Sequence, residues 1–68
     1  MAKDITERYY DWRLKGIEVS KEEEIVFSIK KDFTDRGGLR QEWEQIDNDI
    51  QNEILETWVK DVKRILEK

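Results

Sequence analysis

The stretch DRGGLRQEWE, residues 35–44, holds the only pair of adjacent glycines in a chain that contains no proline. Glycine adopts the left-handed backbone conformation at little steric cost, so a Gly-Gly step can end one helix and start another in a new direction. Apolar residues recur with helical spacing on both sides of this step. The stretch is therefore either a corner between two packed helices or the turn of a DNA-reading helix-turn-helix.

The first helix predicted upstream of the glycines covers about residues 4–15. Asp4 and Glu7 have the three-residue spacing of a capping box, and Gly16 is placed to end the helix in a left-handed turn closed by Ile17, as in a Schellman motif. One face of this helix carries the apolar residues Ile5, Tyr9 and Trp12.

A second helix is predicted at about residues 20–36, between Ser20 and Gly37. Ser20 and Glu23 again have capping-box spacing, and Gly37 follows the last apolar position. The predicted core-facing stripe consists of Ile25, Val26, Ile29 and Phe33. The run EIVFSI also suits a strand, but the cap and the four-residue spacing favour a helix.

Residues 39–66 could form one long helix or two. Their apolar residues fall into two groups that differ in helical phase by roughly 100°. The first group is Leu39, Trp43, Ile46 and Ile50, and the second is Ile54, Leu55, Trp58, Val62, Ile65 and Leu66. Because a straight helix would have to rotate its buried face midway, we expect one helix at 39–46 and another at 48–66. Asn48, with Gln51 three residues later, is the predicted cap of the second.

These patterns predict a single all-α domain, residues 1–68, folded as a compact bundle of three to four helices. A chain of 68 residues buries a comparatively small share of its surface, and such domains often need reinforcement. Disulfides and thiolate or imidazole metal sites are excluded because the chain contains neither cysteine nor histidine. A partner chain is the reinforcement that remains.

Charge and hydropathy limit the classes of partner. The net charge of −4 opposes phosphate contacts, so the composition argues against nucleic acid. No apolar run approaches the length of a membrane span and no signal-peptide pattern is present, so we expect no membrane partner and a cytoplasmic location. The abundance of lysine and glutamate also resembles the composition of thermophile proteins.

The two arginines beside the glycine pair support the DNA-binding alternative. Arg36 and Arg40 flank Gly37 and Gly38 and would be its nucleic-acid contacts. The next stretch, residues 41–56, carries six acids and no base, so a helix there would be repelled by phosphates. We therefore favour the helical corner and keep DNA binding as the alternative.

The acidic stretch suggests two further functions. Counted from Asp47, an EF-hand loop needs a glycine at its sixth position and an acid at its twelfth, but these positions hold Asn52 and Trp58, so no metal site is predicted. The acids could instead imitate nucleic-acid charge and inhibit a nucleic-acid-binding protein. They are Glu42, Glu44, Asp47, Asp49, Glu53 and Glu56.

No catalytic or cofactor-binding residue is predicted, and we expect no enzyme. Ser20 and Ser28 have no histidine to activate them. The glycine pair lacks the lysine and the spacing of a phosphate-binding loop. The chain also offers no thiolate, and its paired carboxylates lie on strongly polar faces where their protonation would be ordinary.

The sequence instead predicts a protein-interaction surface. The apolar arc of the last helix is wider than a small bundle can cover, and large apolar residues also fall outside the predicted stripes of the first two helices. The expected anchors are Trp58, Val59, Val62 and Leu66, with Tyr10, Leu14 and Phe27 as further candidates. We therefore expect a non-enzymatic subunit that associates with another protein chain, either as a homo-oligomer or by docking on a larger partner.

Overall fold

The computed structural model describes residues 3–68 and contains four α-helices. They are α1 (Ile5–Lys15), α2 (Lys21–Asp35), α3 (Leu39–Glu44) and α4 (Asn48–Leu66). The predicted all-α bundle is confirmed. The break within residues 39–66 is present as well, so this region forms two helices.

The start of α1 confirms Asp4 as the predicted cap, but it shows only the Asp4 half of the predicted capping box. The Asp4 side chain accepts a hydrogen bond from the Glu7 N–H at 2.8 Å, and Gly16 ends the helix with a φ of 70°. The Gly16 N–H donates to the carbonyl of Trp12 at 3.2 Å, and the Ile17 N–H reaches the carbonyl of Asp11 at 3.5 Å. This bonding is closer to the simple αL closure than to the expected Schellman pairing.

The ends of α2 confirm one prediction and correct another. Ser20 and Glu23 form the complete capping box. The helix already ends at Asp35, because Arg36 adopts an extended conformation. Gly38, rather than Gly37, takes the left-handed φ of 89° as the residue that precedes α3. The second glycine of the pair is thus the one whose conformation the corner requires.

The junction between α3 and α4 differs from the predicted cap. Asp47 is the N-cap of α4 and Asn48 is its first helical residue. The Gln51 side chain turns back instead, and its Nε2 donates to the carbonyls of Trp43 at 2.9 Å and Ile46 at 2.8 Å. Gln51 therefore supplies a donor to the Ile46 carbonyl in the α3–α4 junction. It is a second donor for the Trp43 carbonyl, which also accepts from the Ile46 N–H at 3.1 Å.

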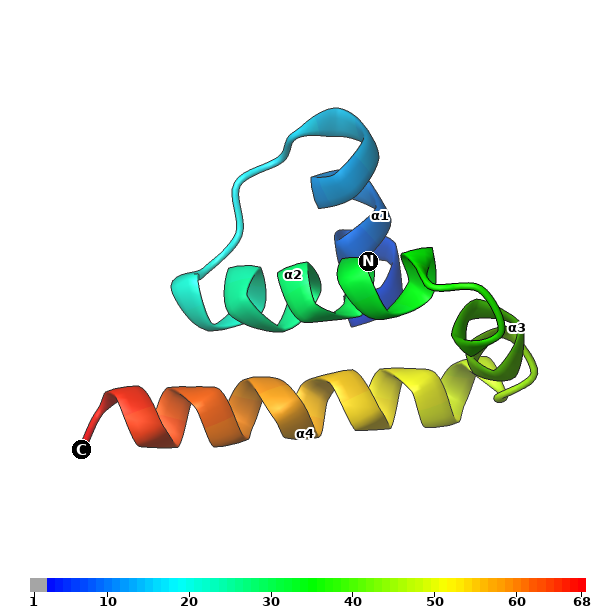
Figure 1. Ribbon diagram of the computed structural model, residues 1–68. Helices are drawn as coiled ribbons and strands as arrows, with labels where there is room; N and C mark the ends of the chain where they lie inside the picture. The colour runs from blue at the N-terminus through cyan, green and yellow to red at the C-terminus, as the bar shows by residue number, and fades with distance from the viewer. Residues whose placement is uncertain (1–2) are drawn as a thin grey trace.

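The four helices pack around one small core. In Figure 1, α2 and α4 run side by side in opposite directions, α1 stands steeply across them, and α3 forms the corner between α2 and α4. The buried hydrophobic residues are Ile5, Tyr9, Val26, Phe27, Trp43 and Leu55. The rings of Tyr9 and Phe27 meet edge to face with centroids 5.5 Å apart, which is a favoured aromatic geometry.

A polar cluster attaches the start of α1 to α4. The Asn52 Oδ1 accepts hydrogen bonds from the Thr6 hydroxyl at 2.6 Å and from the Thr6 N–H at 3.3 Å. The Asn52 Nδ2 donates to the Asp4 carboxylate at 3.3 Å. These bonds satisfy polar groups that the packing of the two helices partly removes from water.

Candidate protein-interaction surface

An apolar groove lies between α2 and α4. Its volume is about 280 Å³, and its walls are formed by Val26, Ile29, Trp58, Asp61 and Val62. The groove exists because the two helices run side by side, so that outward-facing side chains of each helix border the line where they meet. A concave apolar surface between two helices is a common form of helix-binding site.

The rotation of α2 places Ile29 on this surface and corrects the predicted stripe. The sequence pattern predicts Ile29 in the core and Phe27 outside it, but Ile29 is 58% exposed whereas Phe27 is fully buried. The buried side of α2 consists of Val26, Phe27, Lys30 and Thr34. α2 packs against the aromatic residues of α1 as well as against α4. The buried side of the helix is therefore rotated relative to the predicted apolar stripe.

The anchors predicted on α4 all have some exposed surface. Trp58 and Leu66 are 40% and 46% exposed, and Val59 and Val62 are half-buried against the core. The Trp58 ring lies 6.2 Å from the ring of the buried Trp43, so one side of Trp58 belongs to the core and the other remains accessible. The four side chains therefore retain apolar surface that the described part of the chain does not cover.

Two exposed isoleucines of α4 are absent from the predicted anchors. Ile65 is 59% exposed and Ile50 is about half exposed. The sequence pattern places both in the core-facing groups, because it treats every apolar residue on a helical stripe as buried. The width of the apolar arc was the available signal, since residues at its edge cannot all face the same core.

Of the further candidates, the two on α1 are exposed and the one on α2 is buried. Tyr10 and Leu14 are exposed, but neither lines the α2–α4 groove. The Tyr10 ring packs edge to face on Tyr9 with centroids 5.2 Å apart. The prediction for Phe27 is wrong, because Phe27 lies in the core against Tyr9 and Trp12 and has no exposed surface for a partner.

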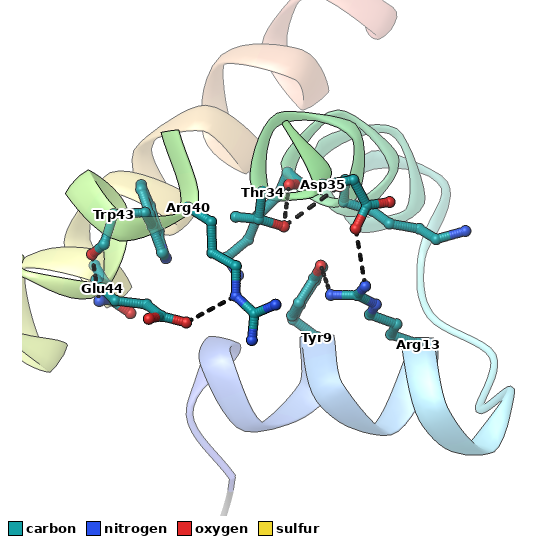
Figure 2. Close-up of polar contacts among 10 residues, drawn as sticks. Tyr9, Arg13, Thr34, Asp35, Arg40, Trp43 and Glu44 are labelled. Atoms are coloured by element: carbon teal, nitrogen blue, oxygen red, sulfur yellow. Dashed lines mark hydrogen bonds and ion pairs between the residues drawn. The ribbon is translucent and has the colours of Figure 1, made fainter. Parts of the chain in front are cut away.

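The two arginines of the DNA-binding alternative form ion pairs within the chain. The Arg36 Nε lies 3.1 Å from Asp32, and the Arg40 Nε lies 3.0 Å from Glu44, as Figure 2 shows for the second pair. The hydrogen bond to Glu44 raises the pKa of the Arg40 guanidinium. α3 has six residues and is therefore only about 9 Å long. A helix of this length provides few positions for reading a DNA groove.

The acidic residues of 41–56 lie on the surface. All six carboxylates belong to exposed residues, and Glu44 is paired with Arg40. Residues 3–68 contain no cluster of three or more side chains suited to holding a metal ion.

Lys30 is a buried charged residue that the sequence patterns did not single out. Its side chain is 2% exposed, and its Nζ lies 3.7 Å from the ring centroid of Tyr9 and 5.3 Å from that of Trp43. Burial, with a smaller contribution from the positive charge of Arg13, lowers the pKa of Lys30 to about 8, and Glu44 opposes this shift. The only available signal was position, since Lys30 shares a helical face with the buried Val26.

Polar contacts near Lys30 join α1 to α2, and an ion pair within α3 lies beside them. In Figure 2, Arg13 lies between Tyr9 and Asp35, and Arg40 extends toward Glu44. Arg13 donates to the Tyr9 hydroxyl at 3.3 Å and to the Asp35 carboxylate at 3.0 Å. Lys30 is therefore a buried lysine whose ammonium is surrounded by aromatic rings, with two ion pairs nearby.

Comparison of the chain with protein-family models, curated proteins and solved structures finds no significant match. Within residues 3–68, no helix combines the length and the apolar content of a membrane span. The apolar groove and the exposed residues beside it are therefore the features from which a function can be inferred.

Proposed function

We propose that this protein is a non-enzymatic interaction module that associates with another protein chain through the exposed face of α4. The observation that supports this is the apolar groove beside Trp58, together with the exposed isoleucines Ile29 and Ile65 on the two helices that form it. Partners are often recognised by an aromatic anchor beside an apolar groove.

The energetic basis is the apolar surface that association would remove from water. Complete burial of one exposed aliphatic side chain contributes about 1.5–3 kcal/mol, before the entropic cost of association. Ile29, Trp58 and Ile65 together offer several such increments. The same burial would reinforce a chain that has no disulfide.

The rival functions have less support. Arg36 and Arg40 are each engaged by a carboxylate of their own helix region, which reduces the positive charge available to a phosphate. The exposed acids of 41–56 are compatible with charge mimicry, but an exposed helix surface is ordinarily rich in charge. The apolar groove has no such general explanation.

Light scattering at several concentrations tests self-association directly. We expect the wild-type mass to exceed that of one chain and to increase with concentration. Ile65→Glu places a charge in the contact and should return the mass to that of a monomer. Leu14→Glu is the matched control, because it makes the same substitution at an exposed aliphatic residue away from the groove. A strict monomer at every concentration would remove self-association and leave docking on a larger chain.

A further inference from the structure

The apolar row of α4 is centred on Trp58. Its residues recur every fourth position and are Ile50, Ile54, Trp58, Val62 and Leu66. Each step turns by about 40°, so the row winds around the helix by roughly 160°. The exposed residues Ile50, Trp58 and Ile65 lie within about 80° of one another and form the accessible part of this surface. Trp58 is close to the middle of α4 and also lines the groove. A twofold interface requires a patch that is complementary to itself, and a row with its aromatic residue at the midpoint can meet this requirement.

The charges of α4 are divided between its two halves. Before Trp58, the charged residues of the helix are the acids Asp49, Glu53 and Glu56. After Trp58, Lys60, Lys63 and Arg64 outnumber Asp61. Two copies of α4 in the same direction would bring acid beside acid and base beside base. Two copies in opposite directions bring the acidic half of each beside the basic half of the other, and their helix dipoles also oppose.

The C-terminal turns of α4 are little covered by the other described residues, 3–64. In Figure 1 the last turns of α4 extend beyond the start of α2, and Ile65 and Leu66 are both exposed there. An oppositely directed second copy would place its first turns, which carry the exposed Ile50, beside these residues. Each copy would thus cover the open end of the other.

We infer that the occupant of this surface is a second copy of the same chain, with its α4 antiparallel to the first and a twofold axis close to Trp58. This inference rests on the proposed function, and it adds the identity of the partner and the direction of the contact. The midpoint position of Trp58, the divided charges and the uncovered final turns all favour the same arrangement.

Engineered cysteines test the arrangement, because the chain has none of its own and each substitution introduces a single thiol. Ile50→Cys and Ile65→Cys are made separately, and the proteins are oxidised in a glutathione buffer, alone and as an equimolar mixture. The two positions are fifteen residues apart, or about 22 Å along a helix. A disulfide needs Cα atoms about 4.4–6.8 Å apart, so only residues that face each other will be joined rapidly.

The antiparallel arrangement predicts that the mixture joins the Ile50→Cys chain to the Ile65→Cys chain at least tenfold faster than either variant forms a disulfide with itself. Thr57→Cys, next to the axis, should couple rapidly to itself while leaving the apolar row unchanged, and Leu14→Cys reports the background rate. Rapid self-coupling of both end variants, in a sample that scatters light as a dimer, would overturn the direction but leave self-association intact. A monomeric sample with background rates throughout would overturn the second copy as the partner.

Discussion

Lys30 lies among aromatic residues in the core, although lysine is ordinarily an exposed residue. Lysine is rarely buried without a charged partner, yet the Lys30 Nζ lies over the ring of Tyr9. The cation–π contact stabilises the ammonium, and its long alkyl chain packs among apolar groups. Burial acts in the opposite direction and lowers the pKa of the Lys30 ammonium to about 8.

The stability of the protein should therefore increase in mildly alkaline solution. The pKa of Lys30 is about 8 in the folded chain, against 10.5 for the ordinary group. Between these two values the unfolded chain retains a proton that the folded chain has lost, so the free energy of unfolding rises with pH across this window, by roughly 1–3 kcal/mol. Below pH 8 both states carry the charge and this contribution is absent.

Lys30→Met should abolish that rise and increase the free energy of unfolding at pH 7, because a buried charge is replaced by an apolar chain of similar length. Urea denaturation at pH 7, 8, 9 and 10 measures both effects. Lys31→Met is the control, since Lys31 is exposed on the same helix. An unchanged pH dependence in Lys30→Met would show that another group is responsible.

The helix boundaries were largely predictable because their signals are local. Asp4 and Ser20 each accept a hydrogen bond from the N–H group three residues later, and Gly16 supplies a left-handed turn. Each of these signals is contained in a few consecutive residues. The rotation of α2 was not predictable in this way. The rotation depends on contacts with the aromatic rings of α1. These contacts bury Phe27 and leave Ile29 exposed.

The candidate surface was predictable to a similar degree. The excess of apolar residues on α4 indicated that some would remain exposed, and Trp58 and Leu66 do. Which residues of α2 would border them could not be known, because that depends on how α2 is rotated. Ile29 was missed for this reason, and Phe27 was included in error for the same reason.

The corner between α3 and α4 depends on the donor group of Gln51. Gln51→Glu keeps the shape of the side chain but replaces its two-donor amide with an acceptor. The Ile46 carbonyl then loses its side-chain donor, and the Trp43 carbonyl keeps only the bond from the Ile46 N–H. We expect a loss of about 1–3 kcal/mol at pH 7, as found when buried polar groups lose a partner. The exposed Gln41 provides the control, because Gln41→Glu should change stability little. Equal stabilities in urea denaturation would contradict this role of Gln51.

At the scale of the whole molecule, the apolar residues are divided between a small core and the exposed face of α4. Helices α2 and α4 share their inner sides with α1 and α3, and the side chains at their outer edges remain in water. Folding and association would then both be stabilised by the burial of apolar side chains. If the chain self-associates, its thermal stability must depend on its concentration.

Thermal unfolding over a hundredfold range of concentration checks this dependence. For a chain that is dimeric throughout the range, each tenfold increase contributes about 0.7 kcal/mol per chain, which corresponds to a rise in Tm of roughly 3–6 °C for a domain of this size. Ile65→Glu should lower the Tm and remove its dependence on concentration, whereas Leu14→Glu should retain it. A constant wild-type Tm would indicate that the folded chain gains nothing from a second copy.

The hydrogen bonds between Thr6 and Asn52 have a consequence for the order in which the molecule is completed. They join residues 46 positions apart, so the polar partner of the first helix is made late in synthesis. At typical translation rates that interval lasts roughly 2–9 seconds. An isolated helix as short as α1 is marginal in water. The rings of α2 can pack against α1 earlier, but the hydrogen bonds of Thr6 form only once α4 has been made. The start of α1, although it is made before α4, therefore obtains its polar partner only after most of the described chain has been made.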